Sequence, residues 1–73
     1  MTNYLSKYRE NARMTQDELA EMAGTTRETI NRLEKGKYSP SLKMAYAIVK
    51  ALQDSYDRKS HGLKIYVEDI WEM

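Results

Sequence analysis

The side chains best suited to recognise an anionic partner lie between residues 27 and 43. This stretch holds five basic and two acidic residues, a local excess of +3, whereas the formal net charge of the 73-residue chain is only +1. Lysine and arginine side chains clustered in this way bind phosphate groups and orient a partner without reading its sequence. Each could also be an ordinary solvated residue, but the excess of charge favours an electrostatic role.

Four polar residues in this stretch would share the solvent-facing side of one helix. A helical wheel places them opposite the apolar pair Ile30 and Leu33, or in the first turn. They are Arg27, Glu28, Asn31 and Arg32. Arginine can hydrogen-bond guanine O6 and N7 together, and glutamate can accept from cytosine N4, so G·C base pairs are a plausible target. The alternative is that Glu28 and Arg32 form only an ion pair one helical turn apart.

Catalytic and metal-binding chemistry have little support in the sequence. The chain has no cysteine and a single histidine, His61, so no zinc site is expected. The acidic pairs Asp17/Glu18 and Glu68/Asp69 each fall at a predicted helix start, where the helix dipole explains them. Neither a nucleophile elbow nor a phosphate-binding loop is recognisable. We therefore expect no cofactor, no metal and no enzymatic activity.

Length and composition predict one small globular domain over residues 1–73. Hydrophobic residues make up 41% of the chain, and there are only three glycines and one proline. Without cysteine the domain must be stabilised by packing, as is typical of the reducing cytoplasm. The longest apolar run, over residues 44–49, is far shorter than the ~20 residues that cross a bilayer. We therefore expect a cytoplasmic protein without membrane association.

Capping signals divide the first half of the chain into three short helices. Asn3 can cap the first, and Thr15 begins a capping box for the second, which ends at Gly24. A capping-box pattern recurs over residues 25–28, so a third helix follows with almost no linker and stops at Gly36. Two short helices meeting across a glycine turn have helix-turn-helix geometry, in which the second helix is free to enter a major groove.

The second half is predicted to form one long helix and a short C-terminal element. The long helix should begin at residue 40 or 41, end near Gln53 or a little beyond, and form the centre of the core. Residues 54–64 are polar and predict a connection or a frayed helix end, with a turn at His61 and Gly62. Beyond it, a short helix over residues 67–71 is favoured over a strand.

Together these motifs resemble the phage repressor and Cro proteins, the XRE family of helix-turn-helix proteins. The resemblance covers residues 3–53, and its pattern consists of Arg9, Thr15-Gln16, Leu19-Ala20, Gly24-Thr25-Thr26, Ile30, Leu33-Glu34, Gly36 and Pro40. It implies an all-α, five-helix, lambda-repressor-like fold with the helix-turn-helix at the second and third helices. It also implies a transcriptional regulator that binds an inverted-repeat operator as a dimer.

The resemblance also implies roles for individual residues. Arg27, Glu28 and Arg32 match positions that touch base edges, and the helical wheel adds Asn31 to this base-reading set. Arg9 and Glu34 match a structural ion pair between the first and third helices. Gln16 matches a position that holds a phosphate at a helix N-terminus, although an ordinary helix residue is the alternative. The predicted phosphate contacts are Gln16, Thr26, Lys35, Lys37, Tyr38 and Lys43.

The C-terminal segment carries several apolar side chains onto a small body. They could close the core beneath the long helix, form a self-complementary patch, or do both. These predicted dimerisation residues are Ile65, Tyr66, Val67, Ile70 and Trp71. A two-fold dimer would present its recognition helices one DNA turn apart, about 34 Å. The polar stretch 54–64 is longer than in short family members, which leaves the half-site spacing open.

We therefore predict a sequence-specific regulator that binds double-stranded DNA at a palindromic operator as a homodimer, most simply a repressor. Two other functions remain open. The chain could be the antitoxin of a toxin–antitoxin pair, with residues 54–73 contacting the toxin. It could also be a protein-interaction module that has lost DNA binding, which the low net charge and the acidic Glu28 would suit.

Overall fold

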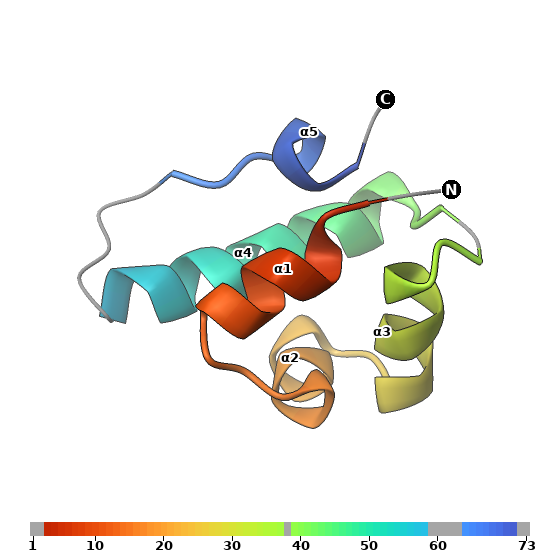
Figure 1. Ribbon diagram of the computed structural model, residues 1–73, viewed down its shortest axis with the longest axis horizontal. Helices are drawn as coiled ribbons and strands as arrows, with labels where there is room; N and C mark the ends of the chain where they lie inside the picture. The colour runs from red at the N-terminus through yellow and green to blue at the C-terminus, as the bar shows by residue number, and fades with distance from the viewer. Residues whose placement is uncertain (1–2, 38, 59–63, 72–73) are drawn as a thin grey trace.

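The computed structural model describes residues 3–37, 39–58 and 64–71, and all regular structure within these ranges is α-helical (Figure 1). The helices are α1 (Leu5–Asn11), α2 (Gln16–Ala23), α3 (Arg27–Glu34), α4 (Leu42–Arg58) and α5 (Val67–Ile70). The predicted all-α, five-helix fold with a helix-turn-helix at α2 and α3 is therefore confirmed. None of these helices is long and apolar enough to cross a bilayer.

The predicted capping box at the start of α2 is present. The Thr15 hydroxyl accepts from the Glu18 amide at 3.0 Å, and the Glu18 carboxylate accepts from the Thr15 amide at 2.8 Å. Gly24 ends the helix with φ +74°, and the next amide, that of Thr25, donates to the Ala20 carbonyl at 2.9 Å. The turn between α2 and α3 is thus set by local hydrogen bonds.

The predicted capping box over residues 25–28 is wrong by one residue. Thr26 is the N-cap of α3, and its hydroxyl accepts from the Thr29 amide at 3.2 Å. The physical reason is that the Thr25 amide is already used to close α2, so α3 starts one residue later. Glu28 therefore does not reach back to cap the helix and faces solvent instead.

The predicted end of α4 near Gln53 is also too early. Ser55 and Tyr56 continue the helix and are 7% and 2% exposed. The Ser55 hydroxyl donates to the Ala12 carbonyl and the Tyr56 hydroxyl to the Tyr8 carbonyl, both at 3.2 Å. These bonds join α4 to α1 and to Ala12, the residue that follows α1, so the first part of the predicted polar connection belongs to the core. The predicted turn at His61 and Gly62 lies outside the described residues.

In the core, α2 packs against both α3 and α4, α1 contacts α3, and α5 contacts α4. The buried hydrophobic side chains of the core are Leu5, Ala12, Met14, Leu19, Ala20, Ile30, Leu33, Ala45, Ile48, Ala51, Leu52, Tyr56, Ile65, Val67, Ile70 and Trp71. Figure 1 shows α5 above α4, with α2 and α3 below α1. The Tyr4 amide donates to the Ile70 carbonyl at 3.0 Å, which joins α5 to the start of α1. The α2–α3 pair and α5 lie on different sides of α1 and α4 (Figure 1).

Candidate nucleic-acid interface

The third helix is held by a narrow apolar stripe. Ile30 and Leu33 are fully buried, whereas Arg27, Glu28 and Arg32 are exposed and Asn31 is half-buried. Residues three apart lie on the same side of a helix, so this stripe leaves the polar side uncovered. The structure thus brings the four predicted base-reading residues together on one accessible surface.

The charged side chains of this surface interact only weakly with one another. Arg32 Nε lies 4.0 Å from Glu28 Oε1, and the two side chains are 60% and 78% exposed. An exposed pair of this kind contributes about 0–1 kcal/mol, so it does not hold either residue firmly. Arg27 makes no ion pair with any residue in the described ranges. The guanidinium groups at both ends of α3 therefore remain available to a ligand.

Three of the predicted phosphate contacts, Lys35, Lys37 and Lys43, lie at the C-terminal end of α3 and the start of α4. A hollow beside α3 is lined by Glu28, Asn31, Arg32, Lys35 and Lys37. Gly36 closes α3 with φ +71°, and the Lys37 amide donates to the Arg32 carbonyl at 3.0 Å. Lys35, Lys37 and Lys43 are exposed. Thr26 is exposed too, with its hydroxyl at 2.9 Å from that of Thr29, and Tyr38 lies outside the described residues.

A largely buried ion pair joins α1 to the end of α3. Arg9 Nε lies 2.6 Å from Glu34 Oε2, and Arg9 Nη2 lies 3.3 Å from Glu34 Oε1. Their side chains are only 13% and 8% exposed. Arg9 Nη1 also donates to the Met14 carbonyl at 2.7 Å, which fixes the guanidinium at both edges. The Arg9 guanidinium thus makes two charge-assisted hydrogen bonds to the Glu34 carboxylate, a bidentate geometry that fixes the orientation of both side chains.

The side-chain amide of Gln16, a half-buried residue, is turned toward α3. Its Nε2 donates to Glu34 Oε1 at 3.0 Å and to Asn31 Oδ1 at 3.4 Å. The side chain expected to meet a phosphate is thus hydrogen-bonded to the recognition helix. Sequence spacing alone does not reveal these contacts, because they depend on how α2 crosses α3.

Comparison with known proteins identifies the class to which this arrangement belongs. The sequence profile of the helix-turn-helix family matches residues 5–55, which include α1 to α3 and most of α4. The chain belongs to the helix-turn-helix family. This confirms the resemblance to XRE-type DNA-binding regulators of transcription.

Relatives that match nearly the whole chain support the same assignment. A protein of Archaeoglobus fulgidus is 42% identical over 73 residues, which are 99% of this chain and 97% of the relative. A second protein of that organism is 50% identical over 72 residues, 97% of each chain. One of Methanocaldococcus jannaschii is 50% identical over 69 residues, 94% of this chain and 98% of the relative. All three are described as HTH-type transcriptional regulators.

Asn3 is a residue of this helix-turn-helix protein whose second contact the sequence did not predict. Its Oδ1 accepts from the Leu5 amide at 3.0 Å, as expected of a residue at a helix start. Its Nδ2 donates to the Leu33 carbonyl at 2.7 Å. One side chain thereby bonds an amide at the start of α1 and gives a second donor to the Leu33 carbonyl, which also accepts from the Gly36 amide at 3.1 Å. The recognition helix is consequently fixed to α1 at two places, by Asn3 and by Arg9.

The predicted dimerisation residues are mostly part of the helix-turn-helix protein's own core. Ile65, Val67, Ile70 and Trp71 are between 1% and 8% exposed, whereas Tyr66 is 55% exposed. Their apolar side chains close the core over α4. Tyr66 is therefore the member of this set that is available to a second molecule.

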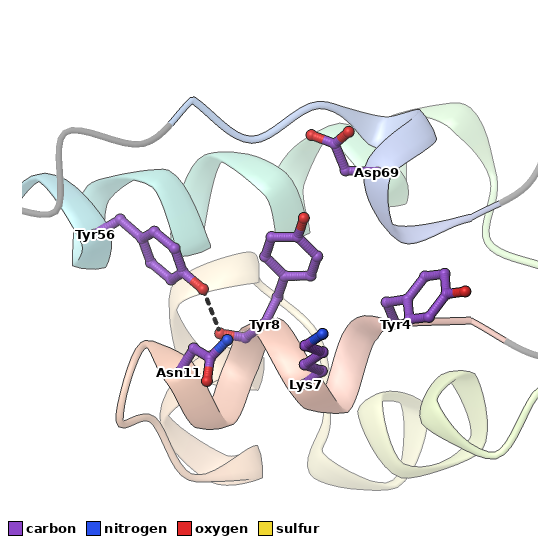
Figure 2. A pocket seen from close by; sticks show the side chains of 6 residues that line it. All are labelled: Tyr4, Lys7, Tyr8, Asn11, Tyr56 and Asp69. Carbon is purple, nitrogen blue, oxygen red and sulfur yellow. Dashed lines mark hydrogen bonds between the residues drawn. The ribbon is translucent and has the colours of Figure 1, made fainter.

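A second hollow lies on the α1 surface of the helix-turn-helix protein (Figure 2). It is lined by Tyr4, Lys7, Tyr8, Asn11, Tyr56 and Asp69. The Tyr8 and Tyr56 rings are stacked with centroids 6.3 Å apart. Burial raises the pKa of the Tyr56 phenol above its ordinary value, the Asn11 side chain lowers it, and Tyr8 raises it slightly further. No cluster of three metal-ligating side chains occurs in the described ranges.

Proposed function

We propose that this helix-turn-helix protein binds double-stranded DNA in a sequence-specific manner and regulates transcription, most simply as a repressor that blocks polymerase. The observation that carries this proposal is the uncovered polar side of α3. Ile30 and Leu33 hold the helix on the core, while Arg27 and Arg32 remain exposed and without a strong internal partner. The names of the relatives, which describe transcriptional regulators, support the same function.

In this proposal α3 enters the major groove and reads base edges with Arg27, Glu28, Asn31 and Arg32. The two arginines favour guanine, because a guanidinium can bond O6 and N7 together. Lys35, Lys37 and Lys43 contact phosphates and fix the register of the helix without selecting a sequence. The hollow beside α3, which is lined by side chains from both sets, supports this division of roles.

We propose further that the protein acts as a homodimer on an inverted repeat. Two copies related by a two-fold axis would present their α3 helices to successive major grooves about 34 Å apart. Tyr66 is exposed on the α5 side, and α4 exposes Leu42 and Tyr46, which are 60% and 61% accessible. Residues 42 and 46 are one helical turn apart, so they share a side of α4 and add apolar surface for association.

Selection from a randomised duplex pool at near-physiological salt tests both proposals. An enriched inverted repeat is expected, and the distance between its half-sites would give the geometry of the dimer. Enrichment of a single half-site would contradict the homodimer and leave sequence-specific binding intact. A pool without enrichment, together with binding that vanishes by ~200 mM salt, would contradict the DNA-reading function. That result would favour a partner-dependent antitoxin or an interaction module.

A further inference from the structure

We propose that the hollow on the α1 surface binds a small aromatic carboxylate, a molecule with one planar ring and one carboxylate group. This α1 hollow has a volume of about 420 Å³, which is within the range of sites that hold small molecules. Its lining comes from α1, the end of α4 and α5, and consists of Tyr4, Lys7, Tyr8, Asn11, Tyr56 and Asp69 (Figure 2). None of these six residues belongs to α2 or α3, so the proposal is independent of DNA recognition.

Tyrosine rings provide the surface against which a planar ring would pack. Tyr4 and Tyr8 are one helical turn apart, and the Tyr8 ring is stacked on that of Tyr56 with centroids 6.3 Å apart. The Tyr56 hydroxyl donates to the Tyr8 carbonyl at 3.2 Å, so Tyr56 supports the Tyr8 ring from inside the protein. Tyr4 is 51% exposed, which leaves its ring accessible to a second aromatic group.

The two charged residues of the α1 hollow differ in how far they are already engaged. The Asp69 carboxylate accepts from the Tyr66 amide at 2.9 Å, at the start of α5. Lys7 is exposed and forms no ion pair with any residue that the structure describes. Its ammonium is therefore the charge more available to a ligand, and it favours an anion. An organic cation held by Asp69 is the alternative that the experiment must distinguish.

Asn11 places a neutral donor beside Lys7. Residues 7 and 11 are one helical turn apart, and both side chains lie at the α1 edge of the hollow (Figure 2). The Asn11 amide is hydrogen-bonded to the Tyr56 phenol and lowers its pKa, so an N–H group is directed to that oxygen. Because an asparagine amide has two N–H groups, the second can donate to a carboxylate oxygen that Lys7 also contacts. The attached ring would then lie against Tyr8.

Titration of the full chain with benzoate, followed by two-dimensional amide NMR without DNA, tests the proposal. We expect saturable shifts at Lys7, Tyr8 and Asn11 with a dissociation constant of about 1 mM, as for a ligand of this size in an open site. Benzylamine has the ring with the opposite charge, and acetate has the carboxylate without a ring. Both should bind about fivefold more weakly or worse, because each lacks one of the two contacts.

Two substitutions with matched controls locate the binding site. Lys7→Met should weaken benzoate binding about fivefold and Tyr4→Ala about threefold, since each removes one contact. Lys50→Met and Tyr46→Ala change exposed residues of α4 outside the hollow and should leave the affinity unchanged. All four side chains are exposed, and thermal unfolding checks that each variant keeps the fold.

Several outcomes would overturn the proposal. Shifts that do not saturate with benzoate would show that the hollow is no binding site. Tighter binding of benzylamine than of benzoate would reassign the hollow to an organic cation at Asp69. Shifts centred on the basic residues around α3, or equal losses for Lys7→Met and Lys50→Met, would indicate only general attraction of an anion to a basic surface.

Discussion

Two arginine–glutamate pairs show how burial decides what a charged side chain does in this protein. Arg9 and Glu34 are 13% and 8% exposed and meet at 2.6 Å. Arg32 and Glu28 are 60% and 78% exposed, and their nearest charged atoms are as far apart as 4.0 Å. The first pair is largely removed from water, so each charge depends on the other. The second pair is solvated, so Arg32 can exchange its partner for a ligand at small cost.

The buried and the exposed pair should respond differently to loss of the carboxylate. Glu34→Ala leaves Arg9 with an uncompensated charge and frees the Gln16 amide, and should lower the free energy of unfolding by about 3 kcal/mol. Glu28→Ala is the matched control and should lower it by less than about 1 kcal/mol. Urea titration of both variants measures these values. Equal losses would show that the Arg9–Glu34 contact contributes little to folding.

Base reading and phosphate binding can be separated by Arg32 and Lys37, which line the same hollow. Arg32→Ala should cost roughly 1–3 kcal/mol on the selected operator and relax the preference at one base position. Lys37→Ala should weaken binding to all sequences similarly and lower the salt slope by about 1. Binding titrations across a salt series on specific and scrambled duplexes distinguish them. Equal, sequence-independent losses would defeat the base-reading role of Arg32.

The turn between α2 and α3 depends on one glycine for its backbone conformation. Gly24 has φ +74°, and a Cβ atom added to it would meet no atom within 4 Å. Gly24→Ala should therefore cost about 1–2 kcal/mol through left-handed backbone strain alone, without a steric clash. Gly24→Asn should cost less, because asparagine tolerates this conformation. Thermal unfolding compares the two, and a larger cost for asparagine would point to a packing conflict in the turn.

Tyr56, in the last turn of α4, should make the free energy of unfolding fall at alkaline pH. Burial raises the pKa of Tyr56 in the folded state above 10.0, so the folded protein retains this proton where the unfolded chain loses it. The contribution of the Tyr56 phenol to the free energy of unfolding is complete below the pKa that it has in the unfolded chain. This contribution is lost as the pH rises through the pKa of the folded state. Tyr56→Phe should show a shallower loss of stability above pH 10. Denaturant unfolding over that range checks this, with Tyr46→Phe as an exposed control.

The sequence predicted the elements whose signals are local and missed details that depend on tertiary contact. The capping box of Thr15 and Glu18 and the turn at Gly24 involve residues close in sequence, so the sequence alone predicts them. The extension of α4 was not, because Ser55 and Tyr56 look polar until they meet the carbonyls of α1.

The same distinction applies to the candidate site. Which residues of α3 face outward follows from helical periodicity, since Ile30 and Leu33 mark the buried side. Arg9 and Glu34 could be paired only through a family resemblance. The contacts of Gln16 with Asn31 depend on the crossing of two helices, for which the sequence carries no periodic signal.

In the whole molecule the C-terminal segment completes the core rather than extending from it. Trp71 is 2% exposed, and its Nε1 finds no acceptor among the described residues. Trp71→Ala should lower stability by about 3–5 kcal/mol, because it removes a large buried side chain. Trp71→Phe should cost substantially less, since it also removes an unpaired buried donor. Calorimetric unfolding tests this order, and a larger cost for phenylalanine would indicate that the indole N–H is satisfied in solution.

The hydrogen bond from the Tyr4 amide to the Ile70 carbonyl brings together two residues that are 66 positions apart in the sequence. Two residues near opposite ends of the sequence are neighbours in the folded state but far apart in an unfolded chain. A covalent link between residues 4 and 70 would therefore restrict the unfolded ensemble much more than the native one, and the lost loop-closure entropy would favour folding. Since this contact joins α5 to the start of α1, a link placed there would not cover the exposed side chains of Arg27 and Arg32 on α3.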